Sequence, residues 1–304
     1  MPIDILIALW PLFALIGLGF WLKKRRLPDE RFWPGAERLN YFVLFPALLF
    51  SSLAGAPLDD PAMPGLVGAV VLALGICTLG LWLARRFRHW PAARFGVFMQ
   101  GTVRFNTYLG LACAGTLFGP QGLSRAGAAL AVMVPLVNLL SVLALCADGR
   151  TSPARLALSV VKNPLILACA GGASFNLAGF SLGGGLDRLV DMMAAASLPL
   201  GLLCVGAALR PREAKGASSA LLINSATRLL LVPWIALGAA ALFNLPPMER
   251  AILVLFFALP TAPTAYVLTR ELGGDSALMA GVITLQTLLS ALTLMLVLSL
   301  AGIF

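Results

Sequence analysis

Histidine, charged residues and reactive clusters are scarce in this chain of 304 residues. The single histidine, His89, excludes a metal site built from several histidines, and its basic neighbours predict a solvated loop residue. The five cysteines lie within or at the end of apolar segments and lack metal-ligand spacing, so we expect small buried residues and no metal. No nucleophile and base pair, metal cluster or phosphate-binding loop is visible. The sequence therefore predicts neither an enzyme nor a cofactor.

Charged residues make up only 12% of the chain, whereas 60% of the residues are hydrophobic and the mean hydropathy is +0.92. Soluble domains contain roughly 45–50% apolar residues. Long apolar runs follow one another with short polar connections, which leaves no room for a soluble domain. The net charge of +9 comes from Lys and Arg in those connections, so we attribute it to membrane topology and not to nucleic-acid binding. We expect one polytopic unit embedded in the lipid bilayer of a cell membrane.

Ten candidate membrane spans follow from these runs. They cover residues 3–22, 36–54, 63–84, 94–118, 122–146, 157–177, 184–208, 217–243, 248–270 and 275–300. The first run has no basic residue before it and no small-residue cleavage site after it, so we expect a retained helix. Basic residues gather in the connections after the first, third, fifth, seventh and ninth spans. The positive-inside rule then places these connections in the cytoplasm and both termini outside.

Short segments recur at a nearly constant offset, which indicates a duplicated unit. W-P-L at 10–12 corresponds to N-P-L at 163–165, Pro46 corresponds to Pro199, and A-G at 126–127 corresponds to A-G at 280–281. Each unit holds five spans, and this odd number means that the two halves enter the membrane from opposite sides. We expect two inverted five-helix repeats, 1–146 and 157–304, joined by a short cytoplasmic linker, 147–156.

Polar residues interrupt the centre of the fourth span, which reads G-T-V-R-F-N-T-Y-L-G-L from 101 to 111. In a helix that begins near Arg94, Arg104 lies roughly 15 Å along the axis, near the middle of a ~30 Å hydrocarbon layer. An arginine there costs roughly 2.5–3.5 kcal/mol on insertion scales, so we expect Arg104 to face protein or a water-filled cavity. Asn106 and Thr107 are candidate N-caps for the second half of this span.

The ninth span contains an interruption at the matching position. Pro260 and Pro263 should break the helix, because proline lacks an N–H and clashes with the carbonyl four residues before it. Either Thr261 as a cap, or Pro263 in the first turn with Thr264 beside it, predicts a new helix start. A proline kink in an otherwise packed helix is the alternative.

Two half-helices that start near the membrane centre direct unpaired N–H groups and positive dipole ends, each about half an elementary charge, into one volume. Such a volume favours an anion, and the guanidinium of Arg104 suits a carboxylate. The alternative for Arg104 is a side chain that snorkels or pairs with a carboxylate of the protein.

Other polar residues have two interpretations each. Asp187 and Asp191 share one helix face near the outer surface, and a structural ion pair there is the alternative to a cation or proton site. Asn138 and Gln286 either support the site or form interhelical hydrogen bonds. Arg228 is expected toward the cytoplasmic end of the eighth span, with its side chain snorkelling to water.

Four segments resemble the auxin efflux carrier family, which includes the plant auxin carriers and bacterial permeases for malonate, malate or related organic acids. The segments are L-N-Y-F-V-L-F-P-A-L-L-F at 39–50, F-N-T followed by L-G-L in the fourth span, V-K-N-P-L at 161–165, and A-L-P followed by V-L-T-R-E-L-G at 258–273. Their order and spacing extend over nearly the whole chain.

The resemblance implies ten helices in two inverted repeats, with the broken fourth and ninth helices crossing. It implies a scaffold of helices one, two, six and seven, a transport domain of the other helices, elevator-like alternating access, and by analogy a homodimer. Carried over by residue, the asparagine that contacts a carboxylate matches Asn106, and the second crossover matches 260–263. The scaffold wall that faces the substrate matches Phe45, Pro46 and Leu49.

The chain departs from the plant carriers at three places. Phe105 replaces a proline, the ninth span lacks an asparagine at its crossover, and residues 147–152 replace a long cytoplasmic loop. These departures favour a smaller carboxylate over auxin.

The main hypothesis is a secondary transporter for a small organic anion, such as a mono- or dicarboxylate or an auxin-like acid. The residues assigned to substrate binding are Arg104, Asn106, Thr107, Phe45, Leu49, Pro260, Thr261, Pro263 and Thr264, with Asp191, Asn138 and Gln286 as coupling or polar support. The alternative is a sodium- or proton-coupled cation antiporter or symporter of similar architecture. A membrane enzyme or a sensor is a third interpretation, and the choice between proton and sodium as a coupling ion stays open.

Overall fold

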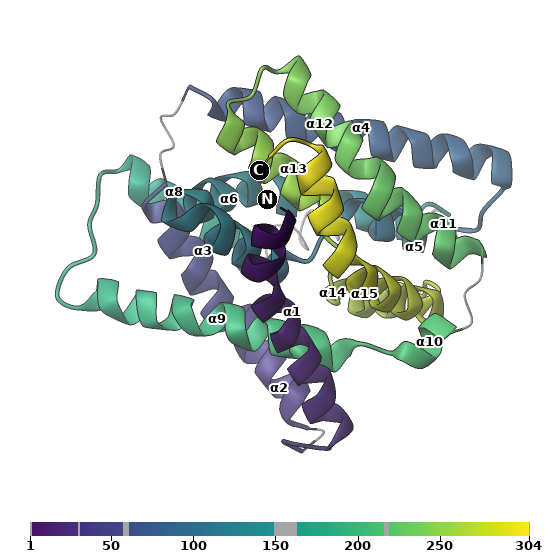
Figure 1. Ribbon diagram of the computed structural model, residues 1–304, viewed down its shortest axis with the longest axis horizontal. Helices are drawn as coiled ribbons and strands as arrows, with labels where there is room; N and C mark the ends of the chain where they lie inside the picture. The colour runs from purple at the N-terminus through teal and green to yellow at the C-terminus, as the bar shows by residue number, and fades with distance from the viewer. Residues whose placement is uncertain (1, 30, 57–60, 149–162, 216–218, 304) are drawn as a thin grey trace.

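The computed structural model describes residues 2–29, 31–56, 61–148, 163–215 and 219–303, and these residues form helices and their connections (Figure 1). No β-strand occurs in these ranges, which confirms the expected all-helical class. The first six residues of the predicted sixth span, 157–162, and most of the expected linker, 147–156, lie outside the described residues.

The first half of the chain is helical over each of its predicted spans. Its elements are α1 (Pro2–Lys24), α2 (Phe32–Leu39), the π-helical turn η1 (Asn40–Leu44), α3 (Phe45–Ala54), α4 (Met63–Arg88), α5 (Ala92–Val103) and α6 (Thr107–Leu145). The elements α2, η1 and α3 follow one another without a gap and cover the second predicted span. Within α6, Gly119 takes a φ of 64°, a conformation suited to glycine, and this kink separates the predicted fourth and fifth spans.

The second half is helical over the described part of each predicted span. It contains α8 (Pro164–Leu177), α9 (Leu186–Ala208), α10 (Pro211–Lys215), α11 (Ser219–Ala226), the π-helical turn η2 (Thr227–Leu231), α12 (Val232–Leu242), α13 (Pro247–Ala258), α14 (Thr264–Glu271) and α15 (Ser276–Leu300). The interruptions expected in the fourth and ninth spans are present, between α5 and α6 and between α13 and α14.

Six helical stretches are long and apolar enough to cross a membrane, by length and composition, among the described residues. Many large apolar side chains face outward: Met192 of α9 is 68% exposed and Leu242 of α12 is 70% exposed. A soluble protein would bury such residues, whereas lipid accommodates them. These observations confirm a multi-pass membrane protein, while the arrangement as ten spans in two inverted repeats stays a prediction.

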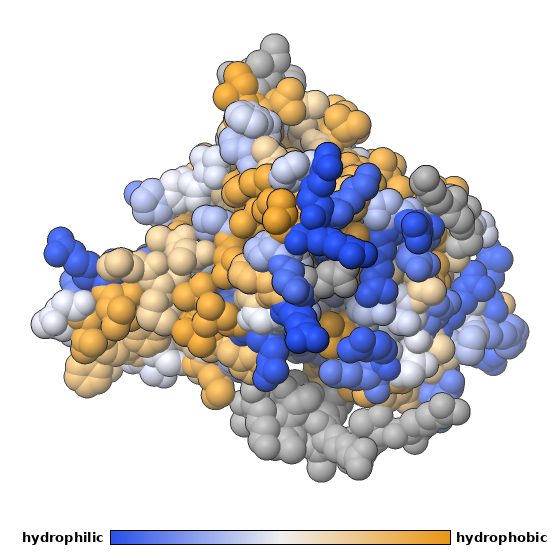
Figure 2. All heavy atoms as spheres, turned by 90° about the horizontal axis from the view of Figure 1, so that it is seen from below, coloured by the Kyte–Doolittle hydropathy of each residue, from blue (hydrophilic) through white to orange (hydrophobic). Residues whose placement is uncertain are grey.

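The lower face of the molecule, toward which the end of α1 points, carries much hydrophilic surface (Figures 1 and 2). Figure 2 shows hydrophilic residues from the middle of this face to its right side, with hydrophobic residues mainly on the left. The last turn of α1 carries Lys23 and Lys24, and the last turn of α2 carries Arg38. This distribution agrees with the basic connection predicted after the first span.

The interrupted helices occupy the centre of the molecule. The side chains of α5 from Phe95 to Val103 and of α13 from Ala251 to Ala258 are all buried. Around them, α1 packs on α9, α3 packs on α8 and α9, and α4 packs on α12 (Figure 1). The two breaks are therefore enclosed by protein and not by lipid.

Close packing of α1 on α9 yields a stability prediction. A Cβ atom added at Gly19 would lie 2.0 Å from the carbonyl oxygen of Leu203, whereas a Cβ at Gly17 would meet nothing within 4 Å. We expect Gly19→Ala to reduce the free energy of unfolding by about 1–3 kcal/mol, the usual effect of overpacking. The matched variant Gly17→Ala should unfold at or above the wild-type temperature. Thermal unfolding of the detergent-purified proteins measures both, and equal melting temperatures would contradict the prediction.

Candidate functional site

Asn106 determines where the second half of the first broken helix begins. α5 ends at Val103 because Arg104 takes an extended conformation, with ψ at 140°. Asn106 is the N-cap of α6, and its side-chain Oδ1 accepts a hydrogen bond of 3.2 Å from the backbone N–H of Leu109. Of the two expected caps, Asn106 and Thr107, the structure has the first. The amide of Asn106 is thus oriented by a backbone contact, as N-capping requires.

The second broken helix restarts two residues later than a cap at Thr261 requires. α13 ends at Ala258, and Pro263 is the N-cap of α14, which begins at Thr264. The prediction of Thr261 as the cap is wrong, because its side chain points elsewhere: Thr261 Oγ1 lies 3.1 Å from the carbonyl oxygen of Gly101 and 2.8 Å from Gln286 Oε1. Proline begins this helix, which agrees with the preference of proline for a first turn.

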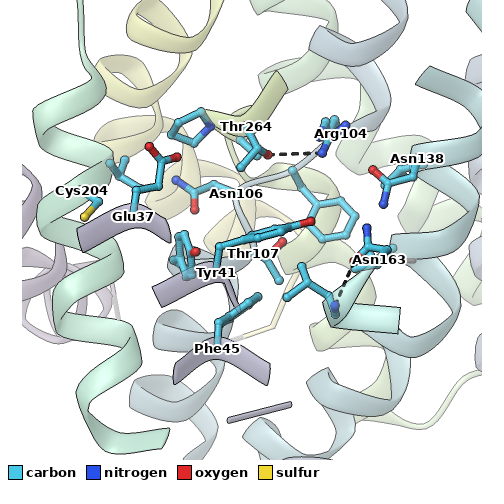
Figure 3. Close-up of a pocket in the computed structure, with 18 residues that line it drawn as sticks. Glu37, Tyr41, Phe45, Arg104, Asn106, Thr107, Asn138, Asn163, Cys204 and Thr264 are labelled. Carbon is cyan, nitrogen blue, oxygen red and sulfur yellow. Dashed lines mark hydrogen bonds between the residues drawn. The ribbon is translucent and has the colours of Figure 1, made fainter. Parts of the chain in front are cut away.

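The two interruptions contact each other directly. The backbone N–H of Asn106 donates to the carbonyl oxygen of Pro260 at 2.8 Å. Arg104 Nη2 donates to Thr264 Oγ1 at 3.3 Å, which links the first break to the start of α14 (Figure 3). Residues far apart in the sequence therefore form one polar centre at the middle of the bundle.

A cavity with about 650 Å³ of empty space, including its open mouth, lies beside this centre (Figure 3). Six of the predicted binding residues and one supporting residue line it: Phe45, Arg104, Asn106, Thr107, Pro263, Thr264 and Asn138. Its remaining walls are mostly apolar and aromatic. This combination of an apolar cavity and few polar groups is typical of a small-molecule site.

Two buried donors at this cavity have no acceptor in the described part of the chain. They are Nη1 of Arg104 and Nδ2 of Asn106. A buried donor without a partner costs about 1–3 kcal/mol, and more when it is charged. Both unpaired groups are donors, and one carries a full positive charge. The cavity is therefore complementary to a ligand that brings acceptors and negative charge.

A third helix also starts at the cavity. α8 begins at Pro164 with Asn163 as its N-cap, whose Oδ1 accepts from the N–H of Leu165 at 2.9 Å. Asn163 lines the cavity together with Asn106 and Pro263, the caps of α6 and α14. The positive ends of three helices meet here, which strengthens the preference for an anion. The sequence indicated a helix start at Asn163-Pro164 but gave no reason to place it beside the two breaks.

Sequence reasoning missed several other lining residues. Glu37 of α2, Tyr41 of η1, Tyr108 of α6 and Cys204 of α9 all line the cavity. Glu37 lies one residue inside the predicted second span, and a carboxylate in that position was the available signal. A buried pairing holds this region to α9, since Asn40 Nδ2 donates to the Ser197 carbonyl at 3.1 Å and Ser197 Oγ donates to Asn40 Oδ1 at 2.9 Å.

Five of the predicted site residues do not line the cavity. Leu49 is fully buried, and Pro260 contributes only its carbonyl to the contact between the breaks. Thr261 and Gln286 hydrogen-bond to each other behind the break. Asp191 lines a different hollow, where it accepts a hydrogen bond of 2.9 Å from Ser51 Oγ.

A second, basic hollow adjoins the cavity. Lys23, Arg210 and Arg270 line it, and it shares Glu37 and Cys204 with the cavity. Arg210 stacks 4.3 Å from the ring centre of Tyr266 and donates to its hydroxyl at 3.0 Å. Positive charge along an approach raises the local concentration of anions.

The fold and the site together define the class. An all-helical membrane chain with two interrupted helices that meet beside a mostly apolar cavity with a few polar groups has the form of a membrane transport protein. The family described as "Membrane transport protein" matches residues 150–298, and the chain belongs to this family, the auxin efflux carrier family. This result confirms the resemblance seen in the sequence, and the family is one of transporters and not of enzymes.

Two relatives align with most of the chain. An "Uncharacterized transporter" of Methanothermobacter thermautotrophicus is 26% identical over 286 residues, which cover 92% of this chain and 93% of the relative. A "Putative malonate transporter" of Rhizobium meliloti is 27% identical over 315 residues, with 93% of this chain and 91% of the relative covered.

Cys204 supplies a native probe of the cavity. It is a free thiol that lines both the cavity and the basic hollow. We expect a small anionic methanethiosulfonate reagent to label Cys204 and small carboxylates to slow the labelling, because reagent and anion compete for the same space. Mass spectrometry of the labelled peptide measures the rate, and Cys204→Ser is the control that removes the signal. A labelling rate unaffected by any carboxylate tested would contradict an anion site here.

Proposed function

We propose that this protein is a secondary transporter for a small organic anion that binds in the cavity between the interrupted helices. The observation that carries the proposal is the pair of unpartnered buried donors, Arg104 Nη1 and Asn106 Nδ2. A carboxylate oxygen is a strong acceptor for both groups, and charge-assisted hydrogen bonds are roughly twice as strong as neutral ones. The ligand would thus satisfy the groups that the protein leaves unsatisfied.

The substrate class that fits is a small mono- or dicarboxylate. The polar groups gather around Arg104 and Asn106, while Phe45, Tyr41 and Val137 give the cavity apolar walls that suit a short carbon chain. A relative that carries the name of a malonate transporter supports a short dicarboxylate as the first candidate.

The proposed mechanism is elevator-type alternating access in a pair of inverted five-helix repeats, 1–146 and 157–304. The scaffold would consist of the predicted helices one, two, six and seven, and the other helices would carry the substrate. Two observations support this division. Asn106 and Pro260, which the repeat offset pairs, contact each other at 2.8 Å, and the cavity lies between the breaks and scaffold residues such as Phe45. We further propose that both termini lie outside, that the basic connections face the cytoplasm, and that the protein is a homodimer.

The substitution Asn106→Asp changes the charge of the site but keeps a residue that can cap α6. Aspartate also caps a helix N-terminus, so α6 should keep its start and the protein its melting temperature. The added carboxylate repels the substrate and pairs with Arg104, so we expect uptake of radiolabelled malonate into liposomes to fall by about tenfold or more.

Asp191→Asn is the matched control for this variant, because Asp191 lies outside the cavity. This control should transport at the wild-type rate. Unchanged uptake by a folded Asn106→Asp variant would exclude the crossover as the anion site.

The sequence left open a carrier coupled to sodium or to protons. A carboxylate in the cavity favours coupling to protons. Glu37 lines the cavity and lies between it and the basic hollow. A carboxylate near a transported anion favours proton binding when the anion is present, since two like charges repel each other. The cation carrier that the sequence left open would thus become a proton-coupled anion carrier.

Glu37→Gln tests this coupling. We expect the variant to exchange anion across the membrane at a rate close to wild type, because the neutral amide mimics the protonated acid. An imposed pH gradient should accelerate net uptake by the wild-type protein and not by the variant. A pH-gradient effect that is equal in both proteins would exclude Glu37 as the coupling residue.

A further inference from the structure

Arg228 contacts the crossover but does not line the cavity. The expectation that it snorkels to water is wrong: Arg228 lies in η2 and its exposed fraction is 0%. Its guanidinium donates three hydrogen bonds, to the carbonyl oxygens of Leu259 at 2.7 Å, Thr102 at 2.7 Å and Phe256 at 2.8 Å. Within the part of the chain that the structure describes, no carboxylate forms an ion pair with it.

The three acceptors belong to the carboxyl ends of the two broken helices. Thr102 is in the last turn of α5, Phe256 is in the last turn of α13, and Leu259 is the C-cap of α13. The last four carbonyls of a helix have no partner within that helix, and each helix end carries about half a negative charge. Two such ends meet in a dry interior, where uncompensated negative charge is costly.

Amide side chains also donate hydrogen bonds to backbone carbonyls near the end of α5. Gln286 Nε2 donates to Gly101 O at 3.0 Å, and Asn224 Nδ2 donates to Phe98 O at 3.1 Å. These groups are neutral, so among the side chains that donate to these carbonyls Arg228 is the one with a full positive charge. A full cation next to two half-charges of opposite sign gives a balanced centre.

We propose that Arg228 is a tethered cation that takes the place of a metal ion at the carboxyl ends of α5 and α13, and that it positions the substrate-binding residues of the crossover. Leu259 directly precedes Pro260, whose carbonyl receives the N–H of Asn106, and Thr102 lies two residues before Arg104. Arg228 therefore holds both breaks through one or two peptide units. The transporter needs no sodium ion at the crossover, because the side chain already supplies the charge.

The transport test compares ionic media and substitutions at Arg228; this test rests on the proposed function. We expect malonate uptake by the wild-type protein to be equal in sodium and in choline medium. Arg228→Ala should reduce uptake by about tenfold or more, since charge-assisted hydrogen bonds are lost. Added guanidinium should restore part of this activity, and Arg228→Lys should transport faster than Arg228→Gln. Arg212→Ala, at an exposed position, is the control and should transport like wild type.

The stability test does not depend on the substrate. We expect guanidinium to raise the melting temperature of purified Arg228→Ala and to leave that of the wild-type protein unchanged, because only the variant has a vacant cation position. If the wild-type protein transports no carboxylate, the proposed function fails while this test still decides the role of Arg228. If the alanine variant does not fold, the same comparison is made between the lysine and glutamine variants, and lysine should be the more stable.

Three results would overturn the inference. The first is sodium-dependent uptake or sodium-dependent thermal stabilisation of the wild-type protein. The second is wild-type uptake by Arg228→Ala in choline medium. The third is a glutamine variant that equals the lysine variant in both stability and uptake.

Discussion

Backbone groups that are freed inside a membrane must find partners within the protein, and this constraint organises the whole molecule. Each of the two central helices is broken, which leaves carbonyls at the end of the first half and N–H groups at the start of the second half. No water is available in the hydrocarbon layer to satisfy them, so irregular backbone persists there only inside protein or beside a cavity. Burial of α5 and α13 along nearly their whole length follows from this requirement.

The two sides of the breaks are satisfied in different ways. On the carbonyl side, Arg228, Asn224, Gln286 and Thr261 supply donors. On the N–H side, two side-chain donors, Arg104 Nη1 and Asn106 Nδ2, have no acceptor among the described residues. The protein supplies its own donors to the helix-end carbonyls, but the described part of the chain supplies no acceptor for these two donors. A ligand with acceptor atoms is therefore favoured beside Arg104 and Asn106. Some polar groups at the centre thus hold the broken helices together, and others are available to bind a ligand.

The sequence predicted the helices and the breaks because both depend on local chemistry. Apolar runs predict the helices, while Asn106, Pro260 and Pro263 predict the interruptions from their backbone preferences alone. The direction of a side chain depends on packing, and here prediction failed. Thr261 points behind the break, and Arg228 points inward. Arg228 lies in the π-helical turn η2 and Tyr41 in η1, and such a turn shifts the residues that follow to another helix face. Glu37 and Asn163 reach the cavity through contacts between distant helices, which one sequence does not reveal.

The charges at the cavity limit how an anion can be carried. Arg104 is positive and Glu37 is negative when ionised, so the empty cavity has formal charges that cancel. A monoanion that binds to Arg104 then leaves a net negative charge in a medium of low dielectric constant, which is unfavourable. A proton on Glu37 restores neutrality, because the bound anion, the guanidinium and the neutral acid sum to zero. Arg228 does not change this balance, since its charge is matched by the carboxyl ends of α5 and α13. Under the proposed function, the anion site and Arg228 are therefore electrically separate. For a monoanionic substrate these charges favour a proton on Glu37 as the companion ion.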